Sequence, residues 1–149
     1  MTTILLLSLA GAVIAAMVGT FWYSNATPMG KIHMKYLGFD KLSKEEQKKK
    51  MEEAKPMMAK MYAGQMALSF LTSFAVVFII TESVKNQLTF LMALGFVAFN
   101  WLCFIVPTIG QGILWGNCDP KLAWKKFFSD ILSNLVTVVL VAVMTSFFV

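Results

Sequence analysis

Residues 88–116 read LTFLMALGFVAFNWLCFIVPTIGQGILWG and contain no formally charged side chain. At about 1.5 Å per residue, a helix of this length can cross a bilayer, whose hydrocarbon core is about 30 Å thick. The stretch also contains Asn100 and Gln111, whose amides need hydrogen-bond partners away from water. It therefore predicts a membrane-spanning helix that carries polar groups.

Further apolar blocks lie on both sides of this stretch. The chain has 149 residues, of which 58% are hydrophobic and 14% are charged. Blocks long enough to span a membrane lie at residues 2–23, 61–81, 88–113 and 127–149. Alternation typical of strands is absent, and only helices and closed barrels satisfy their backbone groups in lipid. We therefore predict one all-α domain over residues 1–149, an integral membrane four-helix bundle.

The connection between the first two spans predicts two more helices. Thr27-Pro28 is typical of a helix start, and we expect a short interfacial helix from there to Gly38. Lys31 and Lys35 of this helix would lie against anionic headgroups, and His33 would pack at the water boundary of the same interfacial helix. A charged cytoplasmic helix should follow over residues 41–55, starting from Ser43 and Glu46 at capping-box spacing, with a kink or break at Pro56.

The lysines predict how the chain is threaded. The net charge is +5, arginine is absent, and nine of the thirteen lysines lie in the first connection, one in the second and three in the third. By the positive-inside rule the first and third connections face the cytoplasm. We expect a multi-pass protein of the cytoplasmic (inner) membrane with both termini outside. Anionic lipid headgroups, rather than nucleic acid, account for the basic charge.

Several motifs are similar to those of a known family. FWYS at residues 21–24, GKIHMKYLGF at 30–39, NWLCFIVPTIGQGILWG at 100–116 and KLAWKKFF at 121–128 resemble a prokaryotic family of small four-span membrane proteins. That family is catalogued as a domain of unknown function, number seventeen sixty-one. The resemblance covers nearly the whole chain, implies a four-span fold and supplies no established activity.

Two sets of residues are candidates for contacts between helices. Gly11, Ala15 and Gly19 are four residues apart and share one face of the first span, which predicts close helix packing. Polar groups in the other spans should turn inward to form a seam: Gln65, Ser69, Thr72, Asn100, Asp130 and Asn134. We expect Asn100 to contact a polar residue of another span. The seam is either structural, joining helices, or a cavity for a small solute.

No group of residues in the sequence predicts catalysis, a metal site or a cofactor. The single histidine, His33, has no cluster of carboxylates or cysteines in sequence around it. Asp130 follows Lys125 and Lys126 by about one turn, so it either pairs with a lysine or is stabilised by the N-terminal end of its helix. We therefore predict a structural or accessory subunit, or a homo-oligomer, of a membrane assembly. The alternative is a small-solute transporter or channel that uses the polar seam.

Overall fold

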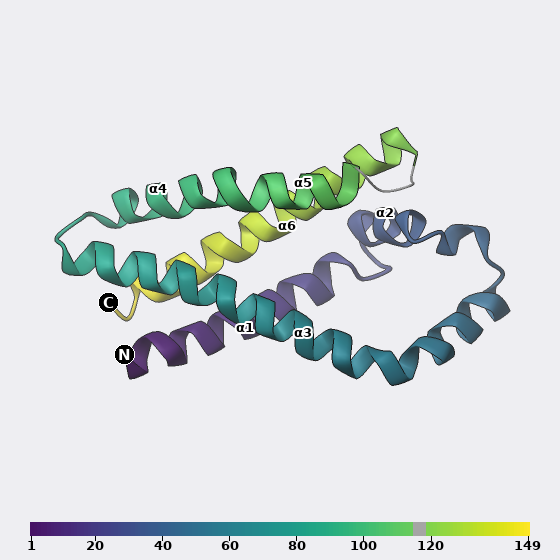
Figure 1. The fold of residues 1–149 in the computed structure, drawn as a ribbon, viewed down its shortest axis with the longest axis horizontal. Coiled ribbons are helices and arrows are strands. Elements are labelled where there is room, and N and C mark those ends of the chain that lie inside the picture. Colours follow the sequence, from purple (N-terminus) through teal and green to yellow (C-terminus); the bar gives the residue numbers. More distant parts are fainter. Residues whose placement is uncertain (115–118) are drawn as a thin grey trace.

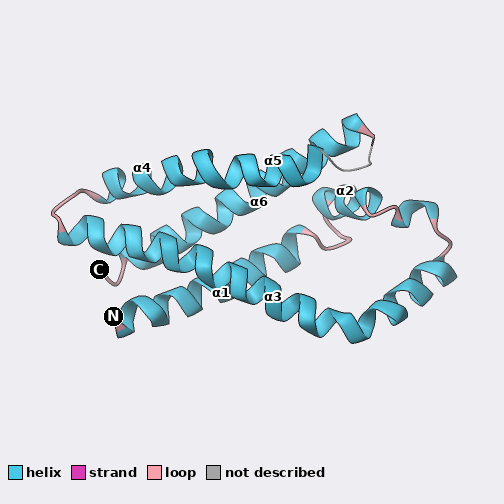
Figure 2. Cartoon of the chain, in the orientation of Figure 1, coloured by secondary structure: helices cyan, strands magenta, loops and turns pink. Residues whose placement is uncertain are grey.

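The structure of the protein is a computed structural model that describes residues 1–114 and 119–149. In these ranges it contains helices and no strand (Figure 2). Four helical segments are long and apolar enough to cross a membrane. In chain order the elements are α1 (Thr2–Trp22), α2 (Pro28–Tyr36), the 3-10 turn η1 (Phe39–Lys41), α3 (Lys44–Lys85), α4 (Phe90–Asn100), the π-helical turn η2 (Trp101–Ile105), α5 (Val106–Leu114) and α6 (Pro120–Ser146). The predicted all-α membrane bundle is confirmed.

Side-chain caps explain where several helices begin. The Thr27 hydroxyl accepts a hydrogen bond from the Gly30 N–H at 2.9 Å at the start of α2. Ser43 forms a reciprocal capping box with Glu46 at the start of α3. Asp119 caps α6 through the Leu122 N–H at 3.0 Å. Each cap satisfies backbone donors that have no partner within the helix, so the predicted helix starts are correct.

The second span is not separate from the charged helix before it. Both belong to α3, a single helix of 42 residues with Pro56 inside it. Proline removes one backbone donor, and a helix whose flanking turns stay bonded kinks there rather than ends. Figure 1 shows α3 changing direction between its charged first part and its apolar second part. Of the two predicted alternatives at Pro56, a kink or a break, the structure shows a helix that continues, so the charged helix and the second span form one bent helix (Figure 1).

The third span contains an irregular turn just before Pro107. Within η2 the Val106 N–H bonds the Trp101 carbonyl, five residues back. The π-helical turn immediately precedes Pro107, which has no N–H to continue the regular pattern. The backbone thus changes its bonding register before proline and remains helical through the span. The final two residues of the stretch at 88–116 lie outside the described ranges.

Helix α6 is the centre of the bundle, in contact with α1, α2, α3, α4 and α5. The apolar core includes Val77, Ile80, Ala93, Val141 and Ala142, all of which are buried. Both termini lie at one end of the molecule, and α2 lies at the other (Figure 1). The core is at the end of the termini, so the opposite end must be held by other contacts.

Candidate functional site

Polar contacts join α1, α2 and α6 at the end of the bundle opposite the termini. Lys126 and Asp130 lie four residues apart on α6 and form an ion pair. Their side chains are 8% and 18% exposed. A charge removed from water to this degree is costly unless it is paired and hydrogen-bonded. The remaining contacts of Asp130 therefore decide whether this arrangement is stable.

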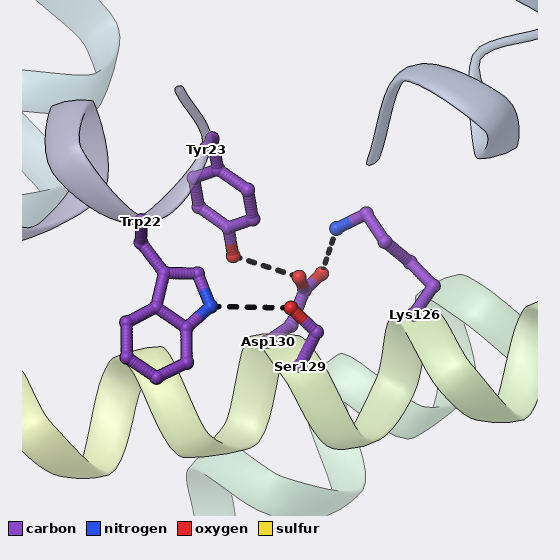
Figure 3. Close-up of polar contacts among 5 residues, drawn as sticks. All are labelled: Trp22, Tyr23, Lys126, Ser129 and Asp130. Atoms are coloured by element: carbon purple, nitrogen blue, oxygen red, sulfur yellow. Dashed lines mark hydrogen bonds and ion pairs between the residues drawn. The ribbon is translucent and has the colours of Figure 1, made fainter. Parts of the chain in front are cut away.

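The end of α1 supplies those contacts. The Tyr23 hydroxyl donates to Asp130 Oδ1 at 2.7 Å, and Trp22 Nε1 donates to Ser129 Oγ at 3.1 Å (Figure 3). Asp130 thus has one oxygen bonded to Lys126 and the other to Tyr23. The bonds from Trp22 to Ser129 and from Tyr23 to Asp130 each join residues that are 107 positions apart in the chain. We name Trp22, Tyr23, Lys126, Ser129 and Asp130 the polar lock.

A tight turn between α1 and α2 holds the lock in place. The Thr27 hydroxyl donates to the carbonyls of Trp22 and Ser24 at 2.6 and 3.0 Å. A Cβ added to Gly30 would lie 1.9 Å from the Ser24 carbonyl oxygen, so only glycine fits at this position. The turn directs Trp22 and Tyr23 toward α6 and brings α2 against the same helix.

Helix α2 covers the lock with aromatic rings. The His33 ring lies 4.8 Å from the Tyr23 ring, centroid to centroid. Lys126 Nζ lies 5.1 Å from the centroid of the Tyr23 ring and 5.7 Å from that of Tyr36, within the range of cation–π attraction. Lys126 therefore has a carboxylate and two aromatic faces around it.

Two groups at this site, Tyr23 just after α1 and His33 of α2, have perturbed pKa values. Burial raises the pKa of the Tyr23 phenol above its usual range, and the hydrogen bond to Asp130 and its charge act in the same direction. Burial lowers the pKa of His33, as does the positive charge of Lys126, while Asp130 opposes them. His33 Nδ1 is buried with no hydrogen-bond partner among the described residues. The phenol therefore stays a donor, and the imidazole favours its neutral form.

His33 was expected to pack at the water boundary, and its half-buried ring lies against Tyr23. Lys31 and Lys35 are exposed on α2, whereas His33 turns toward Tyr23. One helical face cannot present all three residues, because residues two apart point in different directions. The lysines alone form the basic surface of α2.

The predicted polar seam is not assembled as one unit. In α3, Gln65 Nε2 bonds Ser69 Oγ at 3.4 Å, and Thr72 bonds the Leu68 carbonyl of its own helix. Gln65 is exposed and Ser69 is buried. These bonds stay within one helix because hydroxyl and amide groups reach the preceding turn. They do not reach Asp130, whose partners come from α1 and α6.

The expected contact of Asn100 with another span is also corrected. Asn100 is exposed and its Nδ2 donates to the Phe96 carbonyl at 2.9 Å, one turn back in the same helix. The part of α4 that faces the bundle is formed by Ala93 and Val97, both buried. In contrast, Asn134 lies inside the bundle, and its Oδ1 is buried with no partner among the described residues.

On the face of α1 that carries Gly11, Ala15 and Gly19, neighbouring helices approach closely at one position. Gly11 is buried, and a Cβ added there would lie 2.8 Å from Ser73 of α3 and 3.1 Å from Val141 of α6. Ala15 is half-buried, and a Cβ at Gly19 would have no atom within 4 Å. Close approach of the helices therefore occurs at Gly11 and not at Gly19.

Trp22, Tyr23, Lys126 and Ser129 were not among the predicted site residues. Two signals in the sequence point to them. Lys126 and Asp130 have the spacing of an ion pair on one helix. Trp22 and Tyr23 each carry a polar atom on an apolar ring. Pairing between α1 and α6 depends on tertiary structure that no local pattern shows.

The fold and these contacts define a multi-pass helical membrane protein. The model of a protein family of unknown function, DUF1761, matches residues 6–146. The chain belongs to this family, as its motifs indicated. No curated protein and no solved structure matches the chain.

Proposed function

We propose that the chain is a subunit of a homo-oligomeric assembly in the cytoplasmic membrane. A second copy packs on the outward face of α4, η2 and α5. The observation that carries this proposal is the exposure of Asn100, a carboxamide on the outer surface of a membrane span. A polar group of this kind turns toward a protein partner, because lipid offers none.

The third span has fewer buried residues than α6, although the two segments are about equally apolar. Its most apolar window has a mean hydropathy of 2.1 and is 11% buried, whereas that of α6 has a mean hydropathy of 2.0 and is 33% buried. Both segments are apolar enough to lie in the membrane. The difference in burial leaves the third span with a large surface for a further partner.

The chemistry of Asn100 favours a second copy of this chain as that partner. Asn100 lies twelve residues after Leu88, about 18 Å along a regular helix and close to the middle of the bilayer. One amide hydrogen is used within the helix, which leaves a second donor and an acceptor. A carboxamide is self-complementary, so two copies related by a two-fold axis can exchange hydrogen bonds.

The subunit count in native-lipid nanodiscs tests this proposal. Wild type is expected to contain two or more copies, and Asn100→Leu to shift strongly toward one copy with its helix content unchanged. Thr20→Val is the matched control, because Thr20 is also exposed and also bonds a carbonyl of its own helix. Equal subunit counts for wild type and Asn100→Leu would reject the proposal.

The proposed orientation places both termini outside. It is supported by the lysine distribution, because α2 and the charged part of α3 lie at the end opposite the termini (Figure 1). In a background with both cysteines replaced by serine, cysteine at Lys49 should be protected from an impermeant thiol reagent in intact cells. Cysteine at Asn86, in the turn between α3 and α4, should react. The reverse pattern would invert the orientation.

One observation favours small-solute transport as a second candidate. Asn134 Oδ1 is buried in the bundle without a partner in the described residues, and a solute or water could donate to it. Proteoliposome swelling with urea and with glycerol separates the two candidates. Transport predicts faster swelling than empty liposomes and its loss in Asn134→Leu. The subunit proposal predicts no difference from empty liposomes.

A further inference from the structure

The structure contains a groove between α2 and α6 that the proposed assembly does not use. Its volume is about 410 Å³. One wall is formed by Met29 and Ile32 of α2 and the other by Trp124, Phe128 and Leu132 of α6. We propose that this groove binds one anionic phospholipid, with an acyl chain against the apolar walls and the phosphate at Lys125.

The apolar wall on α6 has the geometry of an acyl-chain site. Trp124, Phe128 and Leu132 are four residues apart and form one stripe, about 12 Å long. They are 48%, 59% and 44% exposed. The rings of Trp124 and Phe128 stack at 5.9 Å, which makes the upper part of the wall flat. This length covers the part of one acyl chain nearest to the headgroup, because half of the hydrocarbon core is about 15 Å.

The charges at the mouth of the groove are complementary to a phosphate. Lys125 lines the groove, is exposed and forms no ion pair among the described residues. Lys121 is exposed one turn before it on the same face. The adjacent Lys126 is turned inward and paired with Asp130. The polar lock thus removes one lysine from the surface and leaves its neighbour free for the headgroup.

The position of the groove in the fold matches that of a lipid in the proposed orientation. Its charged end is near the start of α6, which the three lysines of that connection place on the cytoplasmic side. Its apolar end points along α6 into the membrane. Trp124 stands at the same level as Lys125, as interfacial tryptophans do. Charged and apolar ends therefore follow the order of a lipid headgroup and its chain.

Native mass spectrometry of the delipidated full chain tests this inference. The added lipid is phosphatidylglycerol or phosphatidylcholine with identical acyl chains. Wild type should retain one phosphatidylglycerol per protomer in preference to phosphatidylcholine. Lys125→Gln should lower the affinity for phosphatidylglycerol about fivefold, since one lysine near a membrane surface contributes about 1 kcal/mol. Lys48→Gln, an exposed lysine of α3 outside the groove, is the matched control and should leave it unchanged.

Two groove-filling variants test the position of the acyl chain. Leu132→Trp and Phe128→Trp replace exposed residues and should reduce retention of both lipids, with melting temperatures close to wild type. Equal effects of Lys125→Gln and Lys48→Gln would show only diffuse attraction between the lysines and anionic lipid, and would overturn the inference. Unchanged lipid retention in both groove variants would also overturn it. Displacement of the lipid by soluble glycerol phosphate would show a phosphate site without a chain and would also contradict it. Retention is counted per protomer, so the result does not depend on the subunit number.

Discussion

The third span and α6 have nearly the same hydropathy and opposite roles in the structure. Three polar residues of α6 face inward: Asp130 bonds Tyr23 and Lys126, and Ser129 bonds Trp22. In the third span Asn100 faces outward, and its bond among the described residues is to its own helix. Hydropathy therefore shows which segments enter the membrane, and only the position of each polar residue on its helix shows which face meets protein.

The comparison has an energetic side. Within α6, removing one partner of the lock leaves a buried charge without a counterion, which is among the costliest changes in a protein interior. In the third span, removing Asn100 leaves no buried group unpaired within the chain. The same kind of substitution should therefore unfold one region and leave the other folded.

The largest effect is expected at Lys126. Lys126→Met leaves the half-buried Asp130 with Tyr23 as its remaining partner among the described residues, and should lower the stability by about 3 kcal/mol or more. Thermal unfolding in mild detergent measures this loss. Lys125→Met, at the exposed neighbour, should change stability by less than about 0.5 kcal/mol. Equal melting temperatures of the two variants would show that the lock contributes little.

The next largest effect is expected at Gly11. A leucine there would collide with Ser73 and Val141, because even a Cβ lies within 3.1 Å of both. Overpacking of this kind costs about 1–3 kcal/mol. Gly19→Leu is the matched control, since no atom lies within 4 Å of its Cβ position. Similar melting temperatures for both variants would contradict the α1–α3 packing.

A smaller effect is expected from acid. Burial and Lys126 lower the pKa of His33 below its ordinary value of 6.5, so the unfolded state binds more protons than the folded state in that range. Stability should therefore be constant above about pH 7 and fall as the pH drops from 6.5 through the lowered pKa. His33→Gln should flatten this part of the profile of melting temperature against pH. If the melting temperature of His33→Gln depends on pH as that of wild type does, groups other than His33 cause the acid sensitivity.

The smallest effect on the stability of the single chain is expected at Asn100. Asn100→Leu removes an exposed amide whose described contact is within its own helix, and the monomer should change by less than about 0.5 kcal/mol. Thermal unfolding of the monomeric fraction in detergent measures this value. A loss as large as that of Lys126→Met would show that Asn100 has a partner inside the bundle, as the sequence suggested.

The sequence predicts the spans, the helix caps and the family correctly because these depend on local patterns. Capping by Thr27, Ser43 and Asp119 requires residues only three positions apart. The predicted contact of Asn100 with another span of the same chain was wrong. A polar residue in an apolar helix indicates that a partner is needed, but it does not show on which face of the helix that partner lies. The lock was missed because Tyr23 and Asp130 meet only when α1 and α6 pack. At Pro56 the sequence left a kink and a break open, because a proline lowers helix stability without ending the helix in every context.

The most direct test of the α4–α5 interface uses a cysteine that the chain already has. Cys103 lies in η2 and is exposed, three residues after Asn100. In Cys118→Ser, it is the single cysteine of the chain. Oxidation in native membranes should link two copies through Cys103 if the proposed two-fold interface brings their Cα atoms within about 7 Å.

A control and a scan make this measurement decisive. In the variant with both native cysteines replaced by serine, single cysteines are placed at Phe96, Phe104 and Pro107, which leave Asn100 in place, and at Met17 on the exposed face of α1. The account predicts disulfide-linked dimers that are strongest at Cys103, weaker at the other positions of the same span and absent at position 17. Equal linking at position 17, or none anywhere on the third span, would contradict it.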